Sequence, residues 1–271
     1  MRDYASITAE FVCLMRALGS EDPHAAAFLS RPFRALGAVW RGAAALGLPV
    51  DAATLGIRPL VLARHRFIDA ALSAALEDGV GQVVLLGAGL DARPWRFAGP
   101  EGSPGERRFF VVDHPATARL RARRRLRMPA GLAEASGIRV DVDFAREDFG
   151  DALLRAGYRP DLPSFFVWEG VSMYLPRFAV SASLGRLAAL MAPGSSLGLD
   201  FWRPGAGKAA VRCVEAASRR GMALIGEPVR FGLAVAEVAP FLGGHGFRVD
   251  ALEVPQAGAW SGLTFVHARR R

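Results

Sequence analysis

The sequence predicts an α/β fold, with a Rossmann-like, mostly parallel sheet of seven strands, an antiparallel last strand and an N-terminal helical lid. From Gly81 onward, short apolar runs alternate with segments of helix length, which is typical of βαβ units and a parallel sheet. The run at residues 83–86 ends in two glycines and an acid, the pattern of a ligand-binding turn in such sheets. The last two apolar runs are joined by a loop too short for a helix, so we expect them to pair antiparallel.

The first region, residues 1–78, is predicted to be helical and to form a lid on the second region, residues 79–271. Apolar residues recur at helical spacing over Thr8–Leu18 and Pro59–Leu76. Ser20-Glu21-Asp22-Pro23 ends the first of these helices. No clean linker separates the two regions, so a single structural domain is expected.

The second region contains the predicted strands and one clear crossover helix. That helix spans Pro176–Met191 and is ended by Pro193-Gly194. The unbroken apolar character of the first strand indicates burial on both faces, as in a parallel sheet covered by helices. The seven predicted strands are Gln82–Leu86, Phe109–Asp113, Ile138–Phe144, Ser164–Glu169, Ser195–Phe201, Phe247–Val254 and Leu263–Ala268.

The turn after the first strand indicates which cofactor binds there. Gly87, Gly89 and Ala92 satisfy a loose form of the dinucleotide fingerprint, a weak signal by itself. Asp91 would place a carboxylate beside the two phosphates of a dinucleotide, which is unfavourable where water is scarce. S-adenosylmethionine instead carries an ammonium and a sulfonium, which a nearby acid attracts. The turn therefore favours S-adenosylmethionine over NAD.

Two further acids end predicted strands. Asp113 can accept hydrogen bonds from both ribose hydroxyls of a nucleoside, or it can cap a helix that starts at Pro115. Glu169 follows the apolar run Phe165–Trp168, and a carboxylate in such a place is either paired or functional. A structural acid bonded to neighbouring backbone is the alternative for Glu169.

The charge and cysteine content limit the function classes. The net charge of +8 predicts attraction for anionic substrates. Arg119–Arg127 is the strongest basic cluster, but it lacks interleaved aromatic residues, so we expect a solvated helix face and no nucleic-acid partner. Cys13 and Cys213 are too few and too distant for a disulfide or zinc framework, and we expect buried thiols in a reducing cytoplasm.

The expected location is the cytoplasm. The first residues show no signal peptide, and no charge-free span is long enough to cross a bilayer. We expect no metal site and no membrane partner. The sequence leaves the oligomeric state open.

Several segments between Thr8 and Phe201 match one family in the same order. They are Thr8-Ala9-Glu10-Phe11 with Arg16-Ala17, Ala63–Asp69, Leu86–Arg93, Val112–Pro115, Val142–Phe144, Asp148-Phe149 and Glu169–Leu175. With these segments the chain resembles the leucine carboxyl methyltransferase-like family of class I S-adenosylmethionine-dependent methyltransferases. The Glu-Gly-x-x-x-Tyr-Leu segment gives the resemblance most of its specificity.

The resemblance implies a cofactor site and its parts. Arg64 would pair with the carboxylate of the methionine half, which suits the paired donors of a guanidinium. Asp148 would accept from the adenine amino group with Phe149 beside the ring, although Asp148 also fits a solvated loop. Glu169 would face the cofactor amino group or the transfer site. The implied cofactor-binding residues are Arg64, Gly87, Ala88, Gly89, Asp91, Asp113, His114, Asp148, Phe149 and Glu169.

The resemblance leaves the acceptor side less defined. Met173 and Tyr174 would line the substrate side, with core packing as the alternative. The catalytic residue is unknown, and the candidates are Glu169, His65 and Tyr174; His114 is more typical of a turn. A carboxylate acceptor arrives ionised and needs no base, whereas a phenol, with a pKa of about 10, does. The absence of a decisive base therefore favours carboxyl methylation.

The sequence thus predicts an S-adenosylmethionine-dependent O-methyltransferase. Its expected acceptor is the carboxylate or phenol of a small, anionic, aromatic compound of the natural-product type, as used in secondary metabolism. Three alternatives stay open: a protein C-terminal carboxyl methyltransferase, a non-catalytic S-adenosylmethionine-binding protein and, more distantly, an NAD-dependent oxidoreductase.

Overall fold

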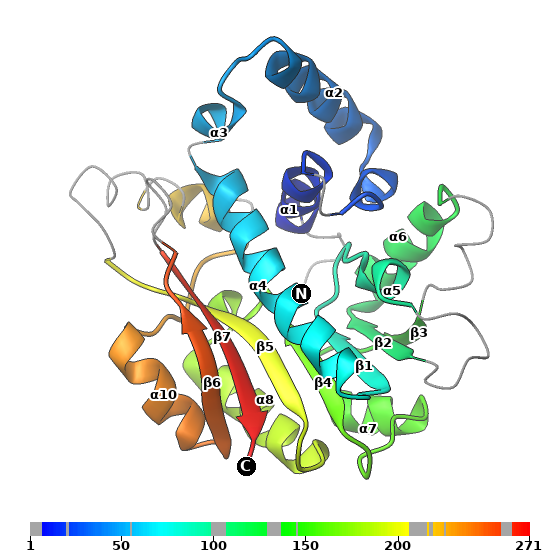
Figure 1. Cartoon of the computed structure of the whole chain (residues 1–271), viewed down its shortest axis with the longest axis vertical. Helices are drawn as coiled ribbons and strands as arrows, with labels where there is room; N and C mark the ends of the chain where they lie inside the picture. Colours follow the sequence, from blue (N-terminus) through cyan, green and yellow to red (C-terminus); the bar gives the residue numbers. More distant parts are fainter. Residues whose placement is uncertain are drawn as a thin grey trace.

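A seven-stranded sheet forms the centre of the molecule (Figure 1). The structure is a computed structural model that describes residues 7–19, 22–54, 56–98, 107–128, 137–144, 146–205, 216, 219–224, 226–255 and 262–271. The strand order across the sheet is β3-β2-β1-β4-β5-β7-β6. The strands are β1 (Gln82–Leu86), β2 (Arg108–Asp113), β3 (Ile138–Asp141), β4 (Ser164–Trp168), β5 (Ser196–Trp202), β6 (Phe247–Glu253) and β7 (Leu263–Arg270).

The strand directions confirm the predicted sheet. The pairs β1–β2, β1–β4, β2–β3 and β4–β5 are parallel. The last strand, β7, runs antiparallel to both β5 and β6 and lies between them. A register shift between Val249 and Ala251 marks a bulge in the edge strand β6.

Strand β3 is three residues shorter than predicted, whereas β4 and β6 each end one residue early. The sequence predicts β3 to continue to Phe144, but it ends at Asp141. Its neighbour β2 ends at Asp113, whose carbonyl accepts a last hydrogen bond from the Val142 backbone N–H at 2.9 Å. Beyond that point no partner strand remains, and the chain turns through Asp143.

Helices cover both faces of the sheet, because alternate strand residues point to opposite sides. Helix α4 (Ile57–Glu77) crosses one face and packs Ile68 and Leu72 against Val83 and Phe165 (Figure 1). The other face packs against α7 (Phe149–Arg155), α8 (Arg177–Leu190) and α10 (Val235–Gly243). The predicted helices Pro59–Leu76 and Pro176–Met191 correspond to α4 and α8.

The N-terminal helices lie above the carboxyl ends of the parallel strands (Figure 1). A third core there joins Leu14 and Phe28 to Trp95, so these helices pack directly on the segment after β1. The predicted helix Thr8–Leu18 corresponds to α1. The elements are α1 (Ile7–Ala17), η1 (Ala25–Phe28), α2 (Arg31–Ala45), α3 (Val50–Ala53) and α5 (Arg93–Arg96).

Helix α6 (Pro115–Arg125) corrects one expectation about its arginines. The sequence predicts a solvated basic face over Arg119–Arg127, yet Arg121 and Arg124 are buried. Arg121 lies over the Trp95 ring at 4.8 Å and donates to the Asp91 carbonyl, and Arg124 donates to the Phe28 carbonyl at 2.5 Å. The reason is that buried loop carbonyls under the N-terminal helices need donors, and long guanidinium side chains reach them.

The remaining expectations concern cysteine, metal and membrane. Cys13 is a buried free thiol, as expected, and Cys213 lies outside the described residues. Among the described residues, no cluster of three or more His, Cys, Asp or Glu side chains could hold a metal ion. Within that same part of the chain, every helix is too short or too polar for a bilayer crossing.

Candidate functional site

A cavity of about 440 Å³ lies at the carboxyl ends of β1, β2 and β4, where open α/β sheets bind ligands. Its volume is in the range of cofactor sites. Helix α1 supplies Thr8, Ala9, Val12 and Arg16 to its wall. The predicted site residues in the lining are Arg64, Gly87, Ala88, Gly89, Asp91, Asp113, His114, Glu169, Met173 and Tyr174.

A second cavity of similar volume lies between α4 and the β6–β7 pair. Its lining consists of four alanines together with Arg66, Phe67, Glu253 and His267. None of the predicted site residues reaches it. We therefore assign the candidate site to the cavity at the strand ends.

The turn after β1 forms the floor of this cavity. Gly87 and Gly89 have φ values of +65° and +52°, in the left-handed region that favours glycine. The backbone N–H groups of Gly87 and Ala88 donate to the Val112 carbonyl at 2.9 and 3.1 Å, which ties the turn to β2. A Cβ atom on Gly87 would approach Val171 Cγ2 to 2.7 Å. Any larger residue would therefore both strain the turn and push on the opposite wall.

Asp113 stands at the tip of β2 beside this turn. Its carboxylate accepts hydrogen bonds from the backbone N–H groups of Gly89 and His114, the second at 2.6 Å. A carboxylate offers about four acceptor positions, so two remain for a ligand. Burial raises the pKa of Asp113 even though both backbone bonds favour the charged form. His114 also lines the cavity, where its Nδ1 caps α6 by accepting from the Ala116 N–H.

Glu169 sits just beyond β4 and is held by cations on both oxygens. Oε1 accepts from Arg64 Nε at 3.0 Å, and Oε2 lies 2.7 Å from Arg93 Nη2 and 3.3 Å from His65 Nδ1. Burial alone would raise the pKa of Glu169, but the charges of Arg93 and Arg64 lower it well below its usual range. Glu169 is therefore a fixed negative charge and a weak base, which argues against it as the catalytic base.

Arg64 enters the cavity from α4. It pairs through Nε with Glu169 and through Nη1 with Asp200 at 3.3 Å. These two pairs leave Nη2 for a ligand, beside Gly170, whose added Cβ would lie 3.3 Å from it. Asp200 on β5 also accepts from the Gly170 N–H at 2.6 Å, so it fixes both the guanidinium and the cavity backbone.

Arg93 connects the charges beneath the cavity and is fully buried. Its guanidinium contacts Asp69 at 2.6 Å, Asp91 at 2.5 Å and Glu169 at 2.7 Å. Burial alone would raise the pKa of Asp91, but Arg93 and then Arg16 lower it to about 2. Asp91 therefore stays ionised at the cavity wall.

Arg16 links helix α1 to the same turn. Its Nη2 donates to the Leu90 carbonyl at 2.8 Å. Its Nη1 lies 3.4 Å from Asp22 and 3.9 Å from Asp91. The helix that covers the cavity is thus fastened to the glycine turn by a buried cation.

Three predicted site residues lie outside the lining. His65 is turned into the ion network, where Arg93 and Arg96 each approach one ring nitrogen to 2.8 Å. Asp148 caps α7 by accepting from the Asp151 N–H and pairs with Arg186 at 2.8 Å. Phe149 packs in the core, and its ring centroid lies 6.4 Å from that of Phe144, which lines the cavity. The adenine role of Asp148 and Phe149 stays a prediction.

Sequence reasoning missed other lining residues. Thr8 and Arg16 belong to the segments that resemble the family, and Val12 lies between them, but the resemblance gives none of the three a role. Glu227 lies far along the chain between a glycine and a proline, and nothing in its local pattern marks it.

The lining carries an excess of negative charge. Asp91, Asp113, Glu169 and Glu227 face only two arginines there, Arg16 and Arg64, and both arginines already pair with acids. Such a cavity attracts a cationic ligand and repels a diphosphate.

Comparison with known proteins gives one family. A family model for leucine carboxyl methyltransferase matches residues 18–188. A Streptomyces coelicolor protein provisionally named an S-adenosyl-L-methionine-dependent methyltransferase is 39% identical over 205 residues, 72% of this chain and 68% of the relative. A Streptomyces avermitilis protein with the same provisional name is 37% identical over 200 residues, again 72% and 68% of the two chains.

Solved structures share the fold. A protein from Thermobifida fusca, provisionally named a methyltransferase, superposes with a TM-score of 0.63 at 15% identity, covering 99% of this chain and 96% of that one. Magnesium protoporphyrin IX methyltransferase from Synechocystis, solved with bound S-adenosylhomocysteine, gives a TM-score of 0.53 at 14% identity, covering 79% and 87%.

Proposed function

Because the chain belongs to the leucine carboxyl methyltransferase family, we propose that its cavity binds S-adenosylmethionine and that the protein transfers the methyl group to a small acceptor. One observation carries the proposal. The glycine turn is bordered by fixed carboxylates, Asp91 and Glu169, and by no free cation among the lining residues. This charge suits a sulfonium and an ammonium and disfavours the pyrophosphate of NAD.

The cavity residues fit the parts of this cofactor. Nη2 of Arg64 is available for the methionine carboxylate, and the Glu169 carboxylate for the amino group. The two open acceptor positions of Asp113 suit the ribose hydroxyls. Gly87, Ala88 and Gly89 line the cavity with little or no side chain, which suits close passage of the methionine part.

The bound cofactor supplies an activated methyl carbon, and the protein has to position the acceptor and exclude water. Helix α1 covers the strand ends, and its Arg16 ties it to the turn, so the reacting atoms are sheltered. The fixed charges of Arg64 and Glu169 orient the cofactor before the acceptor arrives, which avoids reorganisation during transfer.

We propose O-methylation, at a carboxyl or phenol oxygen of a small aromatic compound of the natural-product type. The apolar and aromatic side chains of Phe144, Met173 and Tyr174 in the lining support an aromatic acceptor. A cytoplasmic location belongs to the same proposal and is supported by the free thiol of Cys13.

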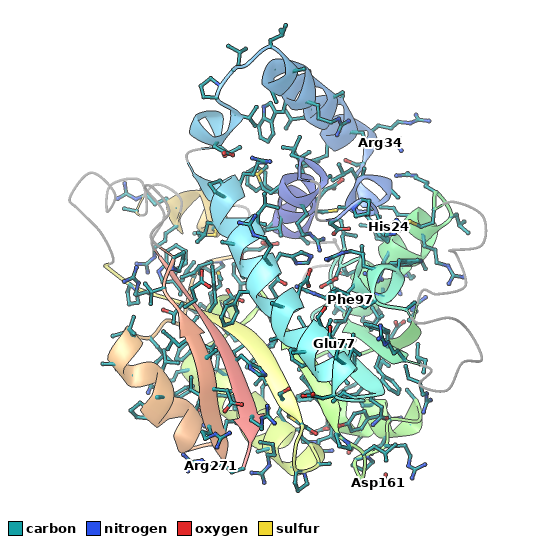
Figure 2. All side chains as sticks on the ribbon, in the orientation of Figure 1. His24, Arg34, Glu77, Phe97, Asp161 and Arg271 are labelled. Carbon is teal, nitrogen blue, oxygen red and sulfur yellow. The ribbon has the colours of Figure 1, made fainter. Side chains whose placement is uncertain are left out.

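Calorimetric titration of S-adenosylhomocysteine tests the cofactor site. Arg64→Ala and Asp113→Ala should each raise the dissociation constant about tenfold or more, because each removes charge-assisted bonds. Arg159→Ala and Asp161→Ala are matched controls, since this exposed pair lies at the end of the molecule opposite α2 (Figure 2). No binding by the parent protein, or equal affinity in all four variants, would contradict the proposed function.

The methylated product tests the reaction. Incubation with labelled S-adenosylmethionine and a panel of aromatic acids and phenols should transfer label to acceptors. A methyl ester releases the label in base, whereas a methyl ether does not. Tight cofactor binding with no acceptor labelled would instead favour a non-catalytic binding protein.

A further inference from the structure

Glu227 stands apart from the other acids of the cavity. It lines the cavity, and its Oε2 atom is buried with no hydrogen-bond partner within the described part of the chain. A buried carboxylate oxygen without a partner is costly, so its presence calls for an explanation. A ligand group that donates a hydrogen bond would satisfy it.

Each of the other lining acids has at least one protein partner on both of its carboxylate oxygens. Both oxygens of Asp91 accept from Arg93, and both oxygens of Asp113 accept backbone N–H groups. Glu169 is held between Arg64 and Arg93. Within the described lining, Glu227 is therefore the carboxylate that has a buried oxygen with no hydrogen-bond partner at all.

Backbone hydrogen bonds place Glu227 on the same wall as Met173 and Tyr174. The Glu227 N–H donates to the Met222 carbonyl at 2.8 Å, which closes a turn around it. Just beyond, the N–H groups of Arg230 and Phe231 both donate to the Met173 carbonyl, at 2.8 and 3.2 Å. This wall belongs to η2 (Ser172–Tyr174) and the segment after β5, apart from the strand-end residues assigned to the cofactor.

The Glu227 carboxylate affects the pKa of Tyr174. Burial and then the nearby Glu227 charge raise the pKa of Tyr174 to about 12, so its phenol stays protonated and is itself no base. The Tyr174 hydroxyl donates to Met222 Sδ at 4.0 Å, and Thr8 of α1 lines the same cavity. Tyr174 and Glu227 therefore line the same cavity as Thr8 of α1, close enough for the Glu227 charge to act on the Tyr174 hydroxyl.

We propose, on the premise of the proposed methyltransferase function, that Glu227 is the proton acceptor of the reaction and that the methylated group is a hydroxyl, of the phenol class, rather than a carboxylate. A phenol has a pKa of about 10 and reaches the site protonated, so it can satisfy the Glu227 oxygen. A carboxylate acceptor would bring a second negative charge beside Glu227, with both lining arginines already paired.

The transfer step balances with this assignment. The acceptor oxygen forms a bond to the methyl carbon as the methyl–sulfur bond breaks, and that bond's electron pair stays on sulfur. The hydroxyl proton passes to Glu227 Oε2. The sulfonium and carboxylate charges cancel, leaving a methyl ether, S-adenosylhomocysteine and a protonated Glu227 that releases its proton to water.

A pair of cofactor analogues tests the position of Glu227 without a known acceptor. Sinefungin carries an amine-bearing carbon in place of the methylsulfonium, whereas S-adenosylhomocysteine has a neutral sulfur there. If Glu227 faces the transfer point, its carboxylate binds the protonated amine. Glu227→Gln should then weaken sinefungin about tenfold and leave S-adenosylhomocysteine within about twofold, as expected for a charge-assisted bond.

The controls separate this inference from the proposed function and from folding. Glu77→Gln is the matched control, because Glu77 is exposed at the end of α4 away from the N-terminal helices (Figure 2), and it should change neither affinity. Glu227→Asp keeps the charge and should recover part of the sinefungin affinity.

Two results would overturn the assignment of Glu227: an unchanged ratio of the two affinities, whether neither or both of them fall, or a base-labile ester as the enzymatic product. If the parent protein binds neither analogue, the cofactor site itself is wrong. A base-stable product together with a selective loss of sinefungin affinity would support both the cofactor site and the assignment of Glu227.

Discussion

Replacement of Arg93 by methionine tests whether the charge network beneath the cavity stabilises the fold. Methionine has a similar length but no charge, so packing changes little while three carboxylates lose a partner. Asp69 still contacts Arg96, and Glu169 still pairs with Arg64 at 3.0 Å. Asp91 retains Arg16 at 3.9 Å as its nearest cation, together with the hydrogen bond from the backbone N–H of residue 93 at 2.8 Å.

The expected loss of unfolding free energy follows from the contacts that remain. One buried carboxylate, Asp91, is left nearly uncompensated, and breaking a buried ion pair in this way costs about 3–5 kcal/mol. For a chain of this size each kcal/mol lowers the melting temperature by about 2–4 °C, so we expect a decrease on the order of 10 °C. Calorimetric or circular-dichroism melts at pH 7 measure it.

The pH dependence distinguishes charge from packing. The pKa values of Asp91 and Glu169 are depressed in the folded protein, so their contribution to stability is present above the unfolded pKa of about 4 and is lost as pH falls through the folded values. Without Arg93 these carboxylates titrate at higher pH and contribute less. The difference in unfolding free energy between the parent and Arg93→Met should therefore be full at neutral pH, shrink as pH falls through the raised pKa of Asp91 in the variant, and be lost as pH falls through the parent value of about 2.

Arg159→Met provides the matched control, because Arg159 pairs with Asp161 on the exposed surface and should give little change. The reasoning about Arg93 would be refuted by a loss no larger than in this control. A loss that stays constant between pH 7 and pH 3 would show that Arg93 acts through packing instead.

Three further predictions concern the cavity. Gly87→Ala should weaken S-adenosylhomocysteine binding about tenfold and lower stability by about 1–2 kcal/mol, because the residue has φ +65° and an added Cβ would clash with Val171. Calorimetric affinities and melting curves that match the parent protein would contradict this prediction. Asp148→Ala should lower stability by about 1 kcal/mol through the lost α7 cap and leave the affinity unchanged, whereas a tenfold loss of affinity would instead confirm its predicted adenine role. The pKa of Asp113 is raised, so affinity should begin to fall with decreasing pH above the usual aspartate range, and titrations between pH 4 and pH 8 that show no change would count against its ribose role.

The sheet and the floor of the site could be predicted because both depend on local pattern. Continuous apolar runs give strands buried on two faces, and an acid directly after such a run is brought to the carboxyl edge of the sheet. Gly87, Asp113 and Glu169 meet at the cavity for that reason. The end of β3 was missed because it depends on where its neighbour β2 stops.

The ion network and the acceptor wall could not be predicted, because they form only through tertiary contacts. His65 follows Arg64 on α4, and a helix turns about 100° per residue. Arg64 therefore enters the cavity while His65 points to Arg96. Helical periodicity alone cannot predict which face of α4 lies at the cavity and which lies at the ion network. Helix α8 and strand β5 lie between Met173 and Glu227 in the sequence, and only the folded structure brings the two segments together.

The position of β7 in the sheet determines when strand β5 obtains its second partner during translation. Strand β5 ends at Trp202, but the strand that pairs with its outer edge starts at Leu263, after β6 has already been translated. A nascent chain that has left the ribosome only as far as β6 therefore presents an unsatisfied, largely apolar strand edge to its surroundings. Translation that stalls before Leu263 would release a species prone to aggregation, even though the glycine turn and most of the cavity residues had been synthesised long before.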